Sequence, residues 1–87
     1  MIAYRVPFDL TRRPPIYRIR NTSLERLHGV SFTLHGSGVM SANAPAVLRA
    51  GESLDVSIAG RRLARDSILV VRWFRPDGVE YLWRVSF

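Results

Sequence analysis

The sequence predicts a single all-β domain, a seven-stranded antiparallel immunoglobulin-like sandwich, and three observations support this. Apolar residues alternate with polar ones at a period of two, and hardly anywhere at the helical period. The alternating segments are short, and Gly, Pro and Asn are frequent between them. The length of 87 residues suits one domain, covering residues 1–87, and is too short for two. A small OB-like barrel of five strands is the alternative fold.

Seven segments carry the strand pattern, and turns separate them. Pro7 ends the first segment, and residues 9–15, which close with two prolines, are interpreted as a connection. Thr22–Glu25 resembles a capping box and Gly60–Asp66 has mild helical propensity, so each can hold one helical turn. The predicted strands are Ile2–Phe8, Ile16–Asn21, Gly29–His35, Val39–Ala42, Leu54–Ile58, Ile68–Phe74 and Val79–Phe87.

The last two strands form a hairpin whose turn determines which side chains face the core. Pro76 stands where a type I turn needs a φ of about −65°, and Gly78 stands where a left-handed residue completes a G1 bulge. This three-residue loop pairs Arg75 with Val79. Counting back along both strands gives one wholly apolar and aromatic side, which we expect to be a core face. Its pairs are Trp73 with Tyr81, Val71 with Trp83 and Leu69 with Val85.

The opposite side of this hairpin is the candidate functional surface, which we call the hairpin face. It comprises Val70, Arg72, Phe74, Glu80, Leu82 and Arg84. A solvent-facing sheet normally carries Thr, Ser and charged residues, whereas apolar residues mixed with arginine suit a protein interface. We therefore expect a protein partner or a second copy of the chain to bind here. The alternative is that a loop, the first strand or a helical turn of the same chain covers these side chains.

The middle of the chain resembles bacterial immunoglobulin-like accessory modules of the CARDB type and the alpha-galactosidase-associated type. The motifs that carry the resemblance are Ile19–Ser23, Val30–Leu34 with Gly36, and Leu48–Glu52 leading into Leu54–Ile58. They lie within residues 17–59, about half of the chain, and are mainly turn signals. Ala50 stands where the family usually has Pro, and the arginine content is unusual for exported modules. The resemblance implies a sandwich fold and a non-catalytic accessory role, and it transfers no binding residues.

The net charge of +6 makes nucleic acid the main alternative partner. All thirteen basic residues are arginine, which is consistent with the codon usage of a GC-rich genome and also with guanidinium binding to phosphate. Arginines interleaved with aromatic residues are typical of single-strand binding surfaces. However, the hairpin register assigns Trp73, Tyr81 and Trp83 to the core. We therefore rank arginine-mediated binding of a polyanion below binding of a protein.

The sequence predicts no enzyme, no metal site and no cofactor. The two histidines, His28 and His35, are seven residues apart, so on one continuous strand they would face opposite sides. Ser37 lies between two glycines, which is the composition of an ordinary hairpin turn rather than of a nucleophile beside a base. The acidic residues are scattered, and the absence of cysteine excludes a thiolate site. No small-molecule substrate is indicated.

Neither a signal peptide nor a membrane span is visible in the sequence. The first residues lack the apolar segment of a signal peptide, and no stretch approaches the ~18 apolar residues of a transmembrane helix. We therefore expect a cytoplasmic protein that does not bind a membrane.

Overall fold

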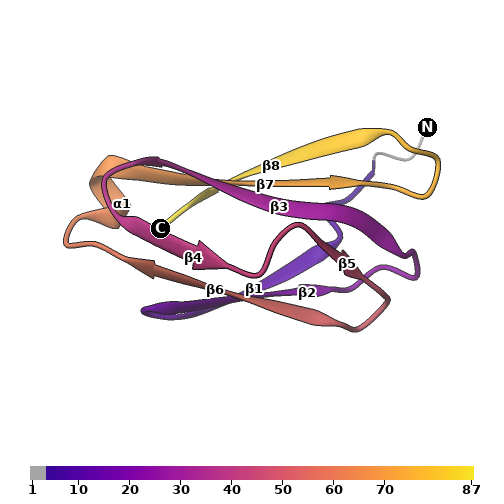
Figure 1. Cartoon of the computed structure of the whole chain (residues 1–87), viewed down its shortest axis with the longest axis horizontal. Coiled ribbons are helices and arrows are strands. Elements are labelled where there is room, and N and C mark those ends of the chain that lie inside the picture. The colour runs from indigo at the N-terminus through magenta and orange to yellow at the C-terminus, as the bar shows by residue number, and fades with distance from the viewer. Residues whose placement is uncertain (1–3) are drawn as a thin grey trace.

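The computed structural model describes residues 4–87, which form two antiparallel four-stranded sheets packed face to face (Figure 1). The first sheet has the strand order β1 (Phe8–Arg13), β2 (Ile16–Asn21), β6 (Ser53–Ala59), β4 (Val39–Ala42). The second has the order β5 (Ala46–Leu48), β3 (Leu27–Gly36), β7 (Ser67–Phe74), β8 (Glu80–Ser86). A single helical turn, α1 (Leu63–Asp66), connects β6 to β7. The predicted sandwich is confirmed, and the sheets do not close into a barrel.

Seven of these strands reproduce the arrangement of a constant-type immunoglobulin domain, in which ABED form one sheet and CFG the other. Strands β1, β2, β6 and β4 take the places of A, B, E and D, and β3, β7 and β8 take those of C, F and G. Strand β5 is an eighth strand beside β3. Because β4 pairs with β6 and β5 pairs with β3, residues 39–48 cross from the first sheet to the second.

The prediction of the first strand is wrong. Of the predicted strand Ile2–Phe8, residues 2 and 3 lie outside the described residues, residues 4–7 are not in a strand, and β1 begins at Phe8. The segment interpreted as a connection therefore contains β1. Its two prolines are the turn itself, because Arg13 pairs with Ile16 and leaves only Pro14 and Pro15 between the strands. The three-residue strand β5 was not predicted.

Of the two predicted helical turns, one forms. The turn within residues 60–66 is α1, whereas residues 22–25 lie outside any helix and residues 23–25 form a bend. The Asn21 side chain determines the conformation there. Its Oδ1 accepts hydrogen bonds from the Ser23 backbone N–H at 2.9 Å and from the Ser23 hydroxyl at 2.7 Å. An asparagine that binds the backbone two residues ahead stabilises a turn in competition with a helix.

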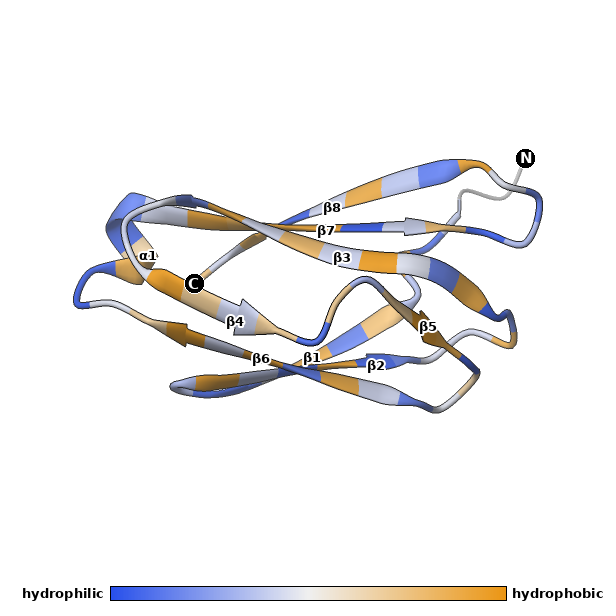
Figure 2. Ribbon diagram, viewed as in Figure 1, coloured by the Kyte–Doolittle hydropathy of each residue, from blue (hydrophilic) through white to orange (hydrophobic). Residues whose placement is uncertain are grey.

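The core lies between the sheets and is built from every second residue of the central strands. Figure 2 shows the resulting bands of hydrophobic and hydrophilic residues along the strands. This alternation buries one face of each sheet and leaves the other face to solvent. The buried apolar residues are Phe8, Tyr17, Ile19, Leu27, Val30, Leu48, Val56, Ile58, Leu69, Val71, Trp73 and Val85.

Candidate functional site

The β7–β8 hairpin has the predicted turn and the predicted register. The Arg75 backbone N–H donates to the Val79 carbonyl at 3.0 Å, and the Gly78 N–H donates to the Arg75 carbonyl at 2.8 Å. Gly78 has a φ of +84°, the left-handed conformation that a G1 bulge requires. The three predicted pairs of the aromatic side are present in the pairing of β7 with β8, and on the other side the same register pairs Phe74 with Glu80, Arg72 with Leu82 and Val70 with Arg84.

The aromatic side of the hairpin faces the core. Trp73 is 1% exposed, and its indole N–H donates to the Tyr4 hydroxyl at 3.2 Å. Trp83 is half-buried and stacks against Phe8, with ring centroids 6.3 Å apart. Neither indole is therefore free to stack on a nucleic-acid base. The polyanion hypothesis therefore gains no support from the two tryptophans.

The hairpin face lies on the outer surface of the second sheet. Leu82 is 60% exposed and Phe74 is 37% exposed, so the described chain leaves Leu82 largely uncovered, whereas the Phe74 ring lies partly over Gly29 of β3. Arg72 donates a hydrogen bond to Glu80 at 3.0 Å diagonally across the two strands. Val70 is half-buried and Arg84 is exposed. The hairpin face thus presents apolar and charged side chains alternately along both strands.

This outer surface continues across β3, where the structure corrects our expectation for the histidines. His28 pairs with Phe74 and His35 pairs with Ile68, and both partners point outward. The two histidines therefore lie on the same face, because the register shifts at Gly29, which has a φ of +54°. A glycine inside a strand pattern is the available signal for such a bulge. The residues between them keep the histidines roughly 20 Å apart along the strand.

The outer surface of the first sheet differs in chemistry. The Arg18 guanidinium donates two hydrogen bonds to Asp55, at 2.7 and 3.2 Å, and these hold the pKa of Asp55 below its usual value. A shallow hollow of about 390 Å³ beside this ion pair is lined by Thr11, Arg13, Ile16 and Arg18. Ile16, 40% exposed, and Val39 are exposed apolar residues of this sheet.

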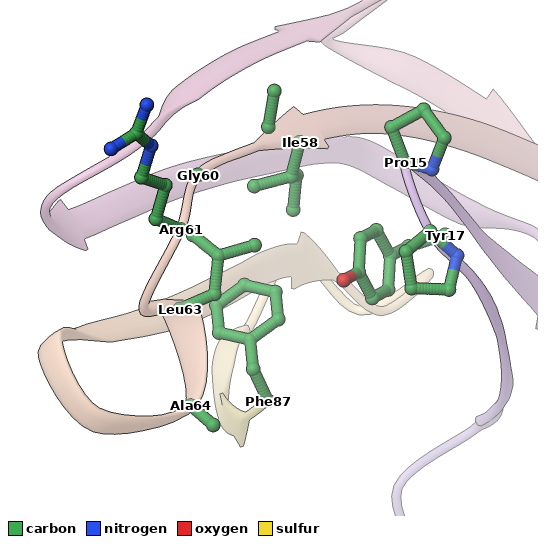
Figure 3. Close-up of a pocket in the computed structure, with 10 residues that line it drawn as sticks. Pro15, Tyr17, Ile58, Gly60, Arg61, Leu63, Ala64 and Phe87 are labelled. Atoms are coloured by element: carbon green, nitrogen blue, oxygen red, sulfur yellow. The ribbon is translucent and has the colours of Figure 1, made fainter.

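A second hollow, of about 470 Å³, lies where the β1–β2 turn, the β6–α1 connection and Phe87 meet (Figure 3). Its lining is mostly apolar and includes Ile58, Leu63 and the two prolines of the turn. Figure 3 shows the Tyr17 hydroxyl turned into the hollow and the Arg61 guanidinium directed away from it. The lining contains no carboxylate and no histidine, so it does not supply the acid and base that proton transfer needs.

A third hollow, of about 400 Å³, brings together His35, Asp66 and Ser67 near α1. These are the residue types of a serine triad, but the hydrogen bonds that define a triad do not connect them in the described chain. The Ser67 hydroxyl instead donates to the Ser37 carbonyl, which ties the Gly-Ser-Gly turn to the start of β7. The interpretation of Ser37 as a turn residue is confirmed by the positive φ of both neighbouring glycines.

Residues 4–87 contain neither a cluster of metal-ligating side chains nor a helix able to span a membrane. Within this range no three His, Cys, Asp or Glu side chains are grouped so that they could hold a metal ion. No helix of the described chain has the length and apolar composition needed to cross a membrane.

Comparison of the chain with protein-family models, with curated proteins and with solved structures finds no match.

Proposed function

We propose that this domain is a non-catalytic protein-interaction module that binds a protein partner through the hairpin face. The observation that supports it most is the exposure of Leu82 and of part of Phe74 on the outer surface of the second sheet, among Arg72, Glu80 and Arg84. Apolar anchors beside arginine match the composition of protein interfaces. The outer surface of a sheet also suits a protein better than it suits a small molecule, which normally binds in a concave pocket.

The resemblance to bacterial accessory modules supports the same proposal. It covers residues 17–59 and implies a non-catalytic accessory role. Asn21, the residue that carries the first motif, has a structural role in this chain: its amide donates to the carbonyls of Glu25 and Leu48, at 2.8 and 3.0 Å. The shared motif therefore supports a similar fold rather than a similar binding site. The surface that we assign to binding is the hairpin face.

A pair of matched variants tests the proposal. The face variant, Val70→Thr with Phe74→Thr, removes two apolar side chains of β7 and keeps residues that favour strands. The control variant, Ile16→Thr with Val39→Thr, removes two exposed apolar side chains of the first sheet. Each immobilised protein is incubated with extract of the source cells, and the retained proteins are identified. We expect a partner that the wild type and the control retain and that the face variant loses.

Retention of the same proteins by all three forms would overturn the proposal. The far-ultraviolet circular dichroism and the urea midpoint of each variant show whether it is folded. The wild-type extract experiment is repeated at two salt concentrations, because binding through phosphate contacts weakens steeply with salt. A retained partner that is a nucleic acid and is lost at high salt would favour the polyanion hypothesis instead.

A further inference from the structure

Strand β8 is the last strand of its sheet, and its outer edge pairs with no other strand of the described chain. The Arg75–Val79 hydrogen bond starts an antiparallel ladder in which alternate residues bond to β7. Tyr81, Trp83 and Val85 direct their N–H and C=O groups toward β7. Glu80, Leu82 and Arg84 therefore direct theirs outward. In agreement with this alternation, the Ser86 carbonyl points outward and accepts a hydrogen bond from Arg12 at 3.0 Å.

The side chains along this free edge of β8 are complementary to those of a second, antiparallel β8. If a second β8 lies antiparallel to the first, with Leu82 opposite Leu82 of the second copy, Glu80 stands opposite Arg84 of the second copy. By symmetry Arg84 then stands opposite Glu80, so both ends of the pairing join opposite charges. On the core side the same register places Tyr81 opposite Trp83 of the second copy. Opposite charges and aromatic pairs are the cross-strand neighbours that stabilise antiparallel strands.

Other registers are less favourable. A shift by one residue would set outward backbone groups against residues whose groups point to β7, so the ladder could not form. A shift by two residues would set Leu82 opposite Glu80 or Arg84 of the second copy and would break the charge pairing. Charged residues on an edge strand usually discourage pairing with another chain. Here their opposite signs, placed symmetrically about Leu82, favour pairing with a second copy.

We infer that two copies of this chain associate by antiparallel pairing of their β8 edges, centred on Leu82, to form one continuous eight-stranded sheet. The contact is isologous, which is the usual geometry of a twofold dimer. It goes beyond the proposed function, because it uses the backbone edge of β8 and leaves Val70 and Phe74 of β7 uncovered. The dimer presents two hairpin faces side by side on one surface.

The charge pairing also fits the ion pair within each copy. Arg72 stands opposite Leu82, so it is diagonal to both Glu80 and Arg84. Glu80 can accept hydrogen bonds from its own Arg72 and from Arg84 of the second copy, since a carboxylate has two acceptor oxygens. Pairing of two short edge strands buries less surface than a permanent dimer does, so we expect a reversible dimer with a micromolar dissociation constant.

Charge reversal tests this inference with the whole chain. In Glu80→Arg, arginines would face arginines at both ends of the pairing, and in Arg84→Glu, glutamates would face glutamates. We expect each variant alone to dimerise at least about tenfold more weakly than the wild type, because each homodimer replaces two attractive pairs by two repulsive ones. An equimolar mixture of the two variants restores opposite charges at both ends. Sedimentation equilibrium of the wild type, of each variant and of the mixture gives the dissociation constants.

Restored dimerisation in the mixture supports the inference even if either variant is somewhat less stable. A wild type that stays monomeric at about 0.5 mM, or a mixture that stays monomeric while the wild type dimerises, would overturn it. Dimerisation that neither variant weakens would also overturn it. The face variant Val70→Thr with Phe74→Thr is expected to dimerise like the wild type. A loss of partner binding in that variant with dimerisation intact therefore distinguishes the two surfaces.

Discussion

The Arg75 guanidinium donates two hydrogen bonds to the Glu25 carboxylate, at 3.0 and 3.1 Å, and lies over the Tyr4 ring, 4.2 Å from its centroid. Arg75 starts the β7–β8 turn, and Glu25 lies in the loop that leads from β2 in the first sheet to β3 in the second. The ion pair therefore ties the tip of the hairpin to the connection between the sheets. Hydrogen bonding to Glu25 is the main cause that raises the pKa of Arg75 above its ordinary value.

This two-point contact predicts that lysine cannot replace Arg75 fully. Arg75→Lys keeps the charge but loses the planar fork that binds both carboxylate oxygens, and Arg75→Ala loses both. We expect the free energy of unfolding to fall in the order wild type, Arg75→Lys, Arg75→Ala, as measured by urea denaturation at pH 7. Arg84→Lys, at an exposed position on β8, serves as the control and should leave the urea midpoint unchanged. Equal midpoints for wild type and Arg75→Lys would contradict the role of the fork.

The Tyr4 hydroxyl gives stability a dependence on alkaline pH. Burial is the largest cause that raises the pKa of Tyr4 above its ordinary value. The folded state therefore holds the phenolic proton more tightly than the unfolded state does. This contribution is fully present below the unfolded pKa and is lost as the pH rises through the folded pKa.

Tyr4→Phe tests this linkage. At pH 8 we expect it to lower the free energy of unfolding by about 1 kcal/mol, because the buried indole N–H of Trp73 loses its acceptor. The difference between wild type and Tyr4→Phe should then shrink above pH 10, because only the wild type loses the Tyr4 contribution. Denaturant unfolding at pH 8, 10 and 11 measures it. A difference that grows with pH would show that the sign is wrong.

The register of the β7–β8 hairpin could be predicted because residues within the hairpin itself determine it. Pro76 and Gly78 specify the turn. The turn then determines every cross-strand pair, as far as Ile68 with Ser86. The hairpin face follows from that register by alternation alone. The exposure of the hairpin face could not be predicted, because a segment that covers it could have come from any part of the chain.

Features that depend on distant partners were not predicted. Strand β5 has only three residues. It forms a strand because it pairs with the edge of β3 after the chain has crossed between the sheets. The bulge at Gly29 moves His28 to the outer surface, and the Phe74 ring, from a strand 45 positions away, lies within 3 Å of where a Gly29 Cβ would be. The free edge of β8 likewise becomes apparent only when the order of strands in the sheet is known.

Asn21 is 0% exposed at the end of β2, and its side chain satisfies four backbone and hydroxyl partners. Asn21→Ala should lower the free energy of unfolding by about 2–3 kcal/mol, because the carbonyls of Glu25 and Leu48 would lose their donor in a buried site. Asn21→Asp should be less stable still at pH 7, since it sets a carboxylate oxygen against those carbonyls. Urea denaturation measures both. Thr22→Ala, at an exposed neighbouring position, is the control and should change stability little.

Two glycines separate the cost of backbone conformation from the cost of a steric clash. Gly36 and Gly78 have φ of +102° and +84°, so alanine is strained at both. At Gly78 nothing lies within 4 Å of an added Cβ, whereas at Gly36 the Asp66 carbonyl oxygen would be 1.8 Å away. We expect Gly78→Ala to lower the free energy of unfolding by about 1 kcal/mol.

Gly36→Ala should cost more than about 3 kcal/mol, because the clashing atom belongs to the backbone and cannot rotate away. Gly36 pairs with Ser67 at the junction of α1 with β7, so relief of the clash requires β3 and β7 to separate there. Thermal and urea unfolding of the two variants provide the comparison. An equal loss of unfolding free energy in the two variants would mean that the α1–β7 junction moves at little cost to relieve the clash. The close approach of β3 to Asp66 would then not determine stability.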